Sequence, residues 1–279
     1  MRSLLQASLQ EMYRREETFT WLMPAAEAIY RPFGFRFIYE KNKMTVTADV
    51  LRRAETDENW QIHSDQEVSG DIFCEEAKKE DLAELACFAE KQLSKLAEVY
   101  TVHDIAYFEQ RMQEVGCEGG SLILIRKEKE ICGYFLALKK DREAWEIVVE
   151  DAVQKKAFPA VLHWFGASEE KCTFTAFPQI WEQYAQSENV PAIMGRIVHL
   201  ERFVCCLKIK KEQEWKIRLT DSLIPENNGY FIIKTGIEGG SLIRVENLSE
   251  KEKKMFCSMD IGQLTEELFR LPVFLNEVV

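Results

Sequence analysis

The spacing of apolar side chains near the start of the chain predicts alternating helices and strands. Leu5, Leu9, Met12 and Tyr13 recur at helical intervals, which predicts an amphipathic helix over residues 2–15. The segments that follow predict a buried strand over 18–23, a helix opened by Pro24 and ended by Gly34, and a strand over 35–39. In an α/β layer a helix normally follows a strand and a loop. The helix predicted over residues 2–15 instead follows Met1 directly. The pattern favours a domain that lacks its front portion over one that begins with a helix.

The middle of the chain is typical of a second α+β unit. Asp81 and Glu84 have the spacing of a capping box ahead of a long helix, and another helix is expected from Asp104. The other expected elements are a strand over 44–51, a polar linker over 52–70, a hairpin of strands 121–126 and 131–138, a strand over 144–152, a helix over 153–166 and a strand over 171–177.

The last part of the chain begins near Pro191 and predicts a small antiparallel sheet with two helices. The expected elements are a strand over 193–198, a helix over 199–207, a meander of strands over 214–221, 229–235 and 241–247, and a closing helix from Asp260. With 46% apolar residues in a chain of 279, these elements predict an α+β protein of about two domains.

The charge of the chain excludes one class of partner. Lysine and arginine number 36 against 47 aspartate and glutamate, for a net charge of −11, and no basic cluster is interleaved with aromatic residues. We therefore expect no nucleic-acid binding. The negative charge would attract cationic, amine-bearing substrates if it lines a cleft, and otherwise it is a solubilising surface.

Cysteine and histidine usage predicts an intracellular protein without a metal site. None of the eight cysteines forms a Cys-x-x-Cys pair, and most stand in apolar runs, which is typical of reduced, buried thiols. The adjacent Cys205 and Cys206 are expected to pack in the core, with redox activity as the alternative. No histidine lies near a cysteine at ligand spacing, so no zinc site is expected.

The sequence also predicts a cytoplasmic location. The first residues have helical periodicity and no small-residue cleavage site, so they do not form a signal peptide. No run of about 18 apolar residues occurs, so no membrane span is expected.

Four segments together resemble one enzyme family. LMPAAEAIYRPFGF (22–35) is similar to the end of the catalytic half of the GNAT acetyltransferases, and more narrowly of the enhanced intracellular survival (Eis) family. HDIAYFEQRMQE (103–114) with its following hairpin resembles the degenerate second acetyltransferase-like domain of that family. PAIMGRIVHLERF (191–203) resembles the opening of its sterol-carrier-like third domain, and LPVFLNEVV (271–279) resembles its C-terminal tail.

The resemblance implies an α+β chain of three parts. Residues 1–60 would be the C-terminal part of a catalytic GNAT domain, 61–188 a degenerate GNAT-like domain, and 189–279 a sterol-carrier-like α/β domain. The acetyl-CoA loop of the family, Arg/Gln-x-x-Gly-x-Gly/Ala, precedes the helix that corresponds to residues 2–15, and this sequence has no counterpart of it. We therefore expect the main acetyl-CoA-binding loop to be missing and the chain alone to be nearly inactive.

By the same resemblance, the chain carries two groups of an N-acetyltransferase. The reaction is attack of a neutral amine on the acetyl-CoA thioester, which needs a base for the ammonium proton and an acid for the leaving thiolate. The resemblance assigns the acid to Tyr30 and the base to the C-terminal carboxylate of Val279. An α-carboxylate is a weak base, and Glu277 nearby would strengthen it or bind the cationic substrate. The implied acceptors are lysines or aminoglycoside-like amines.

A non-catalytic binding or assembly role is the alternative. A sterol-carrier-like domain could hold an apolar ligand, although a packed core explains the same apolar residues: Phe203, Val204, Leu207, Tyr230, Phe231 and Ile232. The family also forms ring-shaped assemblies, so we expect a homo-oligomer if the complete protein is made.

Overall fold

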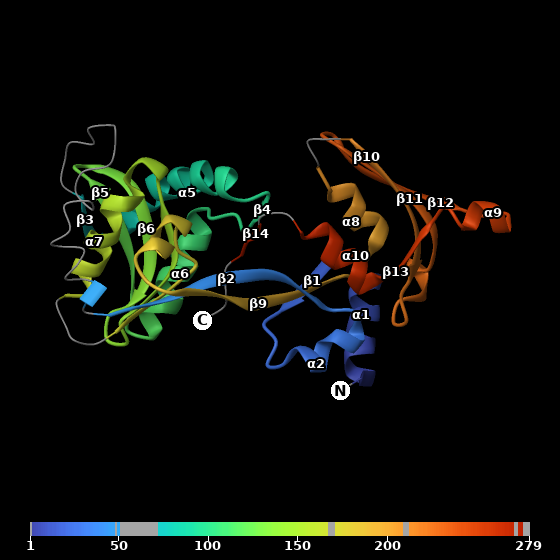
Figure 1. The fold of residues 1–279 in the computed structure, drawn as a ribbon, viewed down its shortest axis with the longest axis horizontal. Coiled ribbons are helices and arrows are strands. Elements are labelled where there is room, and N and C mark those ends of the chain that lie inside the picture. Colours follow the sequence, from blue (N-terminus) through green and yellow to red (C-terminus); the bar gives the residue numbers. More distant parts are fainter. Residues whose placement is uncertain are drawn as a thin grey trace. The chain divides into compact units, whose positions relative to one another are not determined.

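The computed structural model describes residues 2–47, 49–50, 72–166, 171–208, 212–270 and 273–275. The chain forms two compact units, each built from separate segments of the sequence (Figure 1). The first unit comprises Met1–Tyr39 with Ala192–Leu271, and the second comprises Glu40–Pro191 with Pro272–Val279. The division into three domains at 1–60, 61–188 and 189–279 stays a prediction.

The first unit joins a short helix-rich segment to a small sheet. Its elements are α1 (Arg2–Arg14), β1 (Phe19–Leu22), α2 (Glu27–Tyr30), the 3-10 turn η1 (Arg31–Phe33), the start of β2 (Arg36–Val46), the end of β9 (Ser187–Ile197), α8 (Leu200–Cys206), β10 (Gln213–Thr220), the 3-10 turn η5 (Pro225–Asn227), β11 (Gly229–Gly236), β12 (Gly239–Val245), α9 (Glu250–Lys253), β13 (Cys257–Asp260) and α10 (Ile261–Leu268).

Strand pairing in this unit confirms the predicted meander. β10, β11 and β12 pair antiparallel in sequence, and β13 adds to β10 in parallel, which gives the order β12-β11-β10-β13. β1 pairs antiparallel with β9, with Phe19 opposite Ile197. The four-residue β13 was not predicted, because its pairing with β10 depends on a segment far away in the sequence.

Two hydrophobic clusters hold the first unit together. In one, Phe203 and Val204 of α8 pack with Phe231 of β11 and with Leu264 of α10. The other cluster packs Leu9 of α1 against residues that surround η1, β9 and the loop after β10: Phe33, Phe35, Met194, Val198, Leu223 and Ile224. Of the predicted stripe of α1, Leu9 is buried, and Leu5, Met12 and Tyr13 are half-buried against the same cluster.

The second unit is a sheet with helices on both faces (Figure 1). Its elements are the rest of β2 and β9, β3 (Ile72–Glu76), the 3-10 turn η2 (Lys79–Asp81), α5 (Leu82–Leu96), β4 (Val99–Tyr100), α6 (Ile105–Cys117), β5 (Ser121–Lys127), β6 (Glu130–Leu138), β7 (Glu143–Val149), the 3-10 turn η3 (Asp151–Val153), α7 (Gln154–Trp164), β8 (Cys172–Thr175), the 3-10 turn η4 (Gln179–Gln183) and β14 (Val273–Phe274).

The strands of the large sheet in this unit follow the order β9-β2-β8-β7-β6-β5-β3, in which β7 and β8 pair in parallel. β14 pairs in parallel with β4 in a separate two-stranded sheet. Along β5, Leu122 and Leu124 join the cluster under α5 and α6, while Ile123 and Ile125 join the cluster under α7. Because successive strand residues point to opposite faces, a sheet covered on both faces needs an unbroken apolar run. SLILI in this strand is such a run.

Several local predictions were wrong. The strands expected over 35–39 and 44–51 are replaced by one strand, β2, which runs through the polar segment between them and ends at Val46, while residues 49–50 are helical. Asp81 caps the backbone N–H of Lys78 at 2.8 Å rather than forming a box with Glu84. Pro24 does not open a helix, because α2 begins at Glu27 with Ala26 in the extended N-cap position. β3 was missed, and the expected linker over 52–70 lies outside the described residues.

The expectation of buried thiols was also wrong for most cysteines. Cys132 and Cys172 are buried and Cys74 is half-buried, whereas the exposed thiols are those of Cys87, Cys117, Cys205, Cys206 and Cys257. In α8, Phe203 and Val204 occupy the buried face, so the next two residues of the helix lie outside the core. Within the described ranges, no helix is long and apolar enough to cross a membrane.

Candidate functional site

Tyr30 ends a short helix and begins a tight turn. It is the last residue of α2 and the residue before η1, and Gly34 closes that turn in the left-handed region at φ 84°. The side chain of Tyr30 is half-buried and meets Phe35 edge-on, with ring centroids 6.1 Å apart. Its hydroxyl makes no hydrogen bond with the described residues.

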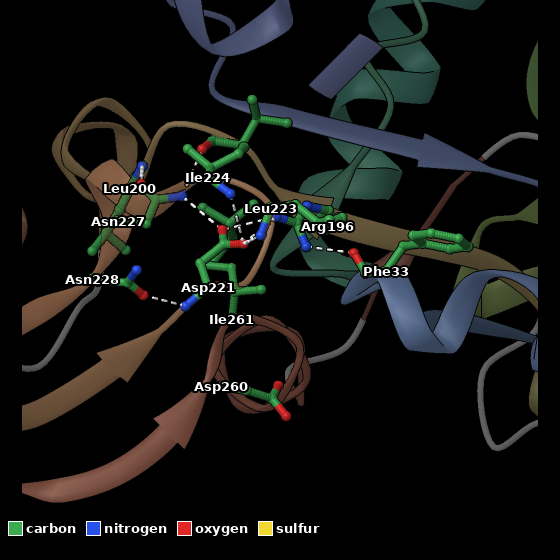
Figure 2. A network of polar contacts seen from close by, with 12 residues as sticks. Phe33, Arg196, Leu200, Asp221, Leu223, Ile224, Asn227, Asn228, Asp260 and Ile261 are labelled. Atoms are coloured by element: carbon green, nitrogen blue, oxygen red, sulfur yellow. Dashed lines mark hydrogen bonds and ion pairs between the residues drawn. The ribbon is translucent and has the colours of Figure 1, made fainter. Parts of the chain in front are cut away.

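A buried ion pair holds the end of the Tyr30 turn. Arg196 of β9 donates from Nη2 to both carboxylate oxygens of Asp221, at 2.7 and 2.8 Å, and from Nη1 to the carbonyl of Phe33 (Figure 2). The side chains of Arg196 and Asp221 are exposed by only 1% and 0%. A guanidinium that spans a carboxylate and a carbonyl fixes the turn relative to the loop that carries Asp221.

The Asp221 carboxylate also organises its own loop. Oδ1 accepts the backbone N–H groups of Leu223 and Ile224 at 3.0 and 3.1 Å, and Oδ2 accepts from the amide of Asn227 at 3.0 Å (Figure 2). Asn227 in turn donates to the carbonyl of Val198 at 2.9 Å and accepts from the N–H of Leu200 at 3.2 Å. The polar atoms of this buried network are therefore largely satisfied, as buried charge requires.

A second arginine holds the start of the strand that follows Tyr30. Arg36 is 9% exposed and donates to the carbonyls of Arg31 and Phe35 at 3.1 and 2.9 Å. It also reaches the carboxylate of Asp260, the N-cap of α10, at 3.5 Å. Arg36 and Arg196 thus tie the Tyr30 turn to two other segments of the first unit.

Gly34 is required for this arrangement. A Cβ at this position would stand 2.8 Å from Cγ2 of Ile261 and would overlap the guanidinium of Arg196. The left-handed φ favours glycine as well. The close approach of Arg196 therefore depends on the absence of a side chain at residue 34.

The other predicted site residues lie outside the described part of the chain. Glu277 and Val279 belong to residues 276–279, of which nothing is described. The assignment of the base to the Val279 carboxylate and of substrate binding to Glu277 stays a prediction, and so does the role of Tyr30 as the acid.

The second unit has a buried polar network at a bulge of β7. Glu146 has a φ of 53° and is 3% exposed. It accepts from the hydroxyl of Tyr107 at 2.5 Å and from Arg111 at 3.0 Å. His103 stacks on Tyr107 at 3.9 Å, and burial, with Arg111 as the lesser cause, lowers the pKa of His103 to about 3. These side chains fill the space between α6 and the sheet.

The strand–helix junction of the second unit does not fit the pyrophosphate of acetyl-CoA. Phosphates bind at helix N-termini that offer free backbone N–H groups and positive potential. Ahead of α7, residues 149–153 read Val-Glu-Asp-Ala-Val, with the carboxylates of Glu150 and Asp151 and no glycine. Two negative charges at this junction would repel a phosphate.

The strand order and the helices on the two faces of the sheet define a mixed α+β protein with the GNAT fold, that of the GCN5-related N-acetyltransferases. The structure is similar to a GCN5-related N-acetyltransferase from Kribbella flavida, with a TM-score of 0.68, 14% identity, and coverage of 96% of this chain and 65% of that one. It is similar to Eis1 from Mycobacterium abscessus, with a TM-score of 0.59, 15% identity, and coverage of 95% and 66%.

A third solved structure gives the same result. It is a conserved protein from Enterococcus faecalis V583, described as a probable N-acyltransferase, with a TM-score of 0.67, 14% identity, and coverage of 95% of this chain and 66% of that one. No family model and no curated protein matches the sequence. The chain thus spans about two thirds of the length of these structures, and a likeness at such low identity establishes the fold alone.

Sequence reasoning missed the buried Arg196–Asp221 pair. One signal was present, because Arg196 stands alone in the apolar run Ile-Met-Gly-Arg-Ile-Val of β9. A charge within a buried strand needs a partner. The polar turn residues Asp221, Asn227 and Asn228 were the acceptors to consider, but no local pattern specifies which of them meets the arginine.

Proposed function

We propose that this chain is part of an Eis-like, GNAT-type N-acetyltransferase that moves the acetyl group of acetyl-CoA to an amine. The observation that carries the proposal is the setting of Tyr30 in a GNAT fold. Its half-buried hydroxyl is unpaired among the described residues, on a turn that Arg196 and Arg36 hold through backbone carbonyls. A fixed proton donor with a free hydroxyl suits general acid catalysis.

In this reaction the amine nitrogen attacks the thioester carbonyl carbon, and the carbon–sulfur bond breaks. The ammonium proton leaves first, to the terminal carboxylate of Val279, so that the amine is neutral when it attacks. The Tyr30 hydroxyl gives its proton to the departing thiolate sulfur. Glu277 binds the cationic acceptor, a lysine or an aminoglycoside-like amine. The two carboxyl assignments rest on the family resemblance.

The second unit has no acetyl-CoA role in this proposal. Glu150 and Asp151 precede α7, and the Glu146 network fills the space beside β7. We expect the 279 residues alone to bind acetyl-CoA weakly, since their sequence has no Arg/Gln-x-x-Gly-x-Gly/Ala loop. Isothermal calorimetry with acetyl-CoA checks this expectation, and a micromolar dissociation constant would contradict it.

The function itself is tested by amine-dependent release of the CoA thiol at millimolar acetyl-CoA, where weak binding is overcome. We expect slow release that depends on the added amine and falls about 100-fold in Tyr30→Phe. Tyr230→Phe, a change of another half-buried tyrosine in the same unit, should leave the rate unchanged. Release that does not depend on the amine, or that survives Tyr30→Phe, would refute the proposal.

The resemblance also leads us to propose a cytoplasmic location and self-association of the complete protein. Analytical ultracentrifugation of the complete protein tests the second point, and a monomer at micromolar concentration would count against it.

A further inference from the structure

A cavity of about 260 Å³ lies within the first unit, apart from the Tyr30 turn. Its walls come from the end of α1, the start of α8, the turn η5 and the strands β11 and β12. The residues that determine its chemistry are Tyr13, His199, Glu201, Glu226, Phe231 and Arg244. This volume suits a small organic molecule rather than a lipid or a coenzyme.

One wall of the cavity is a stacked aromatic pair. The rings of Tyr13 and His199 lie 4.5 Å apart and 8° from parallel. Nδ1 of His199 is buried and has no hydrogen-bond partner among the described residues. A flat aromatic wall of this kind is typical of a binding cavity.

The positive charge in the wall is already engaged. Arg244 donates to the carbonyls of Asn228 and Glu226, both at 2.8 Å, and its guanidinium lies 4.8 Å from the ring centroid of Phe231. The guanidinium therefore joins β12 to η5 and lies over the ring of Phe231. These partners are uncharged, so Arg244 keeps its positive charge, and the two carboxylates of Glu201 and Glu226 outnumber it in the wall.

The negative charges in the wall are not engaged in ion pairs. Among the described residues, neither Glu201 nor Glu226 has an ion-pair partner. Both carboxylates act on Tyr13, because burial first and then Glu226 and Glu201 raise the pKa of its phenol, while Arg244 opposes them. The cavity thus combines two free carboxylates with aromatic walls.

We propose that this cavity binds a small organic ammonium ion, with its charged nitrogen between Glu201 and Glu226 and its apolar body against the Tyr13–His199 wall and Phe231. An ammonium group offers up to three N–H donors, which two carboxylates can accept. Charge-assisted hydrogen bonds of this kind are about twice as strong as neutral ones. An anion would meet two carboxylates against the single guanidinium of Arg244, so the net charge of the wall disfavours it.

The inference goes beyond the proposed function and does not depend on it. It concerns equilibrium binding without acetyl-CoA, and it uses none of Tyr30, Glu277 and Val279. Tyr30→Phe should therefore leave binding in the cavity unchanged. Absence of amine-dependent acetyl transfer by the parent chain, with amine binding in the cavity intact, would refute the proposed function alone.

Calorimetry with the full chain tests the cavity, with 2-phenylethylamine as the cationic probe and 2-phenylethanol as its neutral counterpart. We expect saturable binding of the amine, at least about tenfold tighter than that of the alcohol, and weaker at high salt. Glu226→Gln should weaken amine binding about tenfold, and Glu201→Gln with Glu226→Gln should abolish it.

Glu238→Gln is the matched control. Glu238 is an exposed carboxylate of the same unit that does not line the cavity, so its loss should change amine affinity less than twofold. Circular dichroism would verify that the exposed Glu201 and Glu226 can be replaced without unfolding. Equal affinity for amine and alcohol, absence of binding, or equal effects of Glu226→Gln and Glu238→Gln would overturn the inference.

Discussion

Arg196 and Asp221 form a fully buried bidentate ion pair, with Nη2 at 2.7 and 2.8 Å from the two carboxylate oxygens. Arg196 also donates from Nη1 to the carbonyl of Phe33, at the end of the turn that follows Tyr30. A charge left alone in such a place has neither water nor a counter-ion, so each partner depends on the other.

We expect Asp221→Asn to lower the free energy of unfolding by about 3 kcal/mol, because it leaves the guanidinium of Arg196 buried without a counter-charge. Urea unfolding at neutral pH measures the loss. The surface pair Glu11–Arg14 is the control, since its side chains are 44% and 68% exposed and Glu11→Gln should change stability by less than about 0.5 kcal/mol. A loss of similar size in both variants would contradict the role given to Asp221.

Gly34→Ala should destabilise the chain by about 3 kcal/mol, because the new Cβ adds steric overlap to the strain of a left-handed residue. Gly119→Ala separates the two effects, since Gly119 has a φ of 78° and open space where a Cβ would stand. We expect about 1 kcal/mol for that variant. Thermal unfolding compares them, and equal losses would mean that Arg196 and Ile261 adapt to the methyl group.

Acid should weaken the second unit through His103. Burial lowers its pKa to about 3, so between that value and the ordinary 6.5 the unfolded chain binds a proton that the folded chain does not. Stability is then unaffected above pH 6.5 and falls as the pH drops below it, by at most about 1.4 kcal/mol per pH unit. Urea unfolding from pH 7 to pH 4.5 should show a smaller slope for His103→Gln.

The exposed His163 is the control for this experiment. Its imidazole is in contact with water, so His163→Gln should keep the pH dependence of the parent chain. Slopes that agree between the parent and His103→Gln would show that His103 can become charged within the fold.

Thiol labelling should separate the cysteines into two classes. Burial raises the pKa of Cys132 to about 11 and that of Cys74 to about 12, which leaves almost no thiolate at neutral pH. A disulfide reagent should label the exposed cysteines of the native chain quickly, and Cys74, Cys132 and Cys172 only after unfolding. Mass spectrometry of the labelled peptides identifies the sites, and slow labelling of Cys205 or Cys206 would contradict their exposed positions.

Local periodicity was enough to predict the elements whose buried face shows as a regular pattern of apolar residues within the element. Helix α1 follows from the spacing of Leu5, Leu9 and Met12, and the β5–β6 hairpin follows from two apolar runs that both faces of the sheet cover. The continuous course of β2 could not be predicted in this way. Its polar middle, around Asn42, is held by the side-chain contacts of Asn42 with the backbone of Phe177.

The candidate site could be predicted only in part for the same reason. Tyr30 came from a resemblance, while the residues that hold its turn come from β9 and from the loop after β10, far along the chain. The lone arginine in β9 signalled a buried partner, but only the fold determines that the partner is Asp221. The exposure of Cys205 and Cys206 could have been predicted, because Phe203 and Val204 occupy the buried side of α8.

Strands β2 and β9 each begin in one compact unit and end in the other. A gene segment that encodes either unit alone must therefore stop within a hydrogen-bonded strand rather than in a linker. Cutting the chain at either boundary would therefore divide β2 and β9 and remove part of their backbone pairing in the sheet.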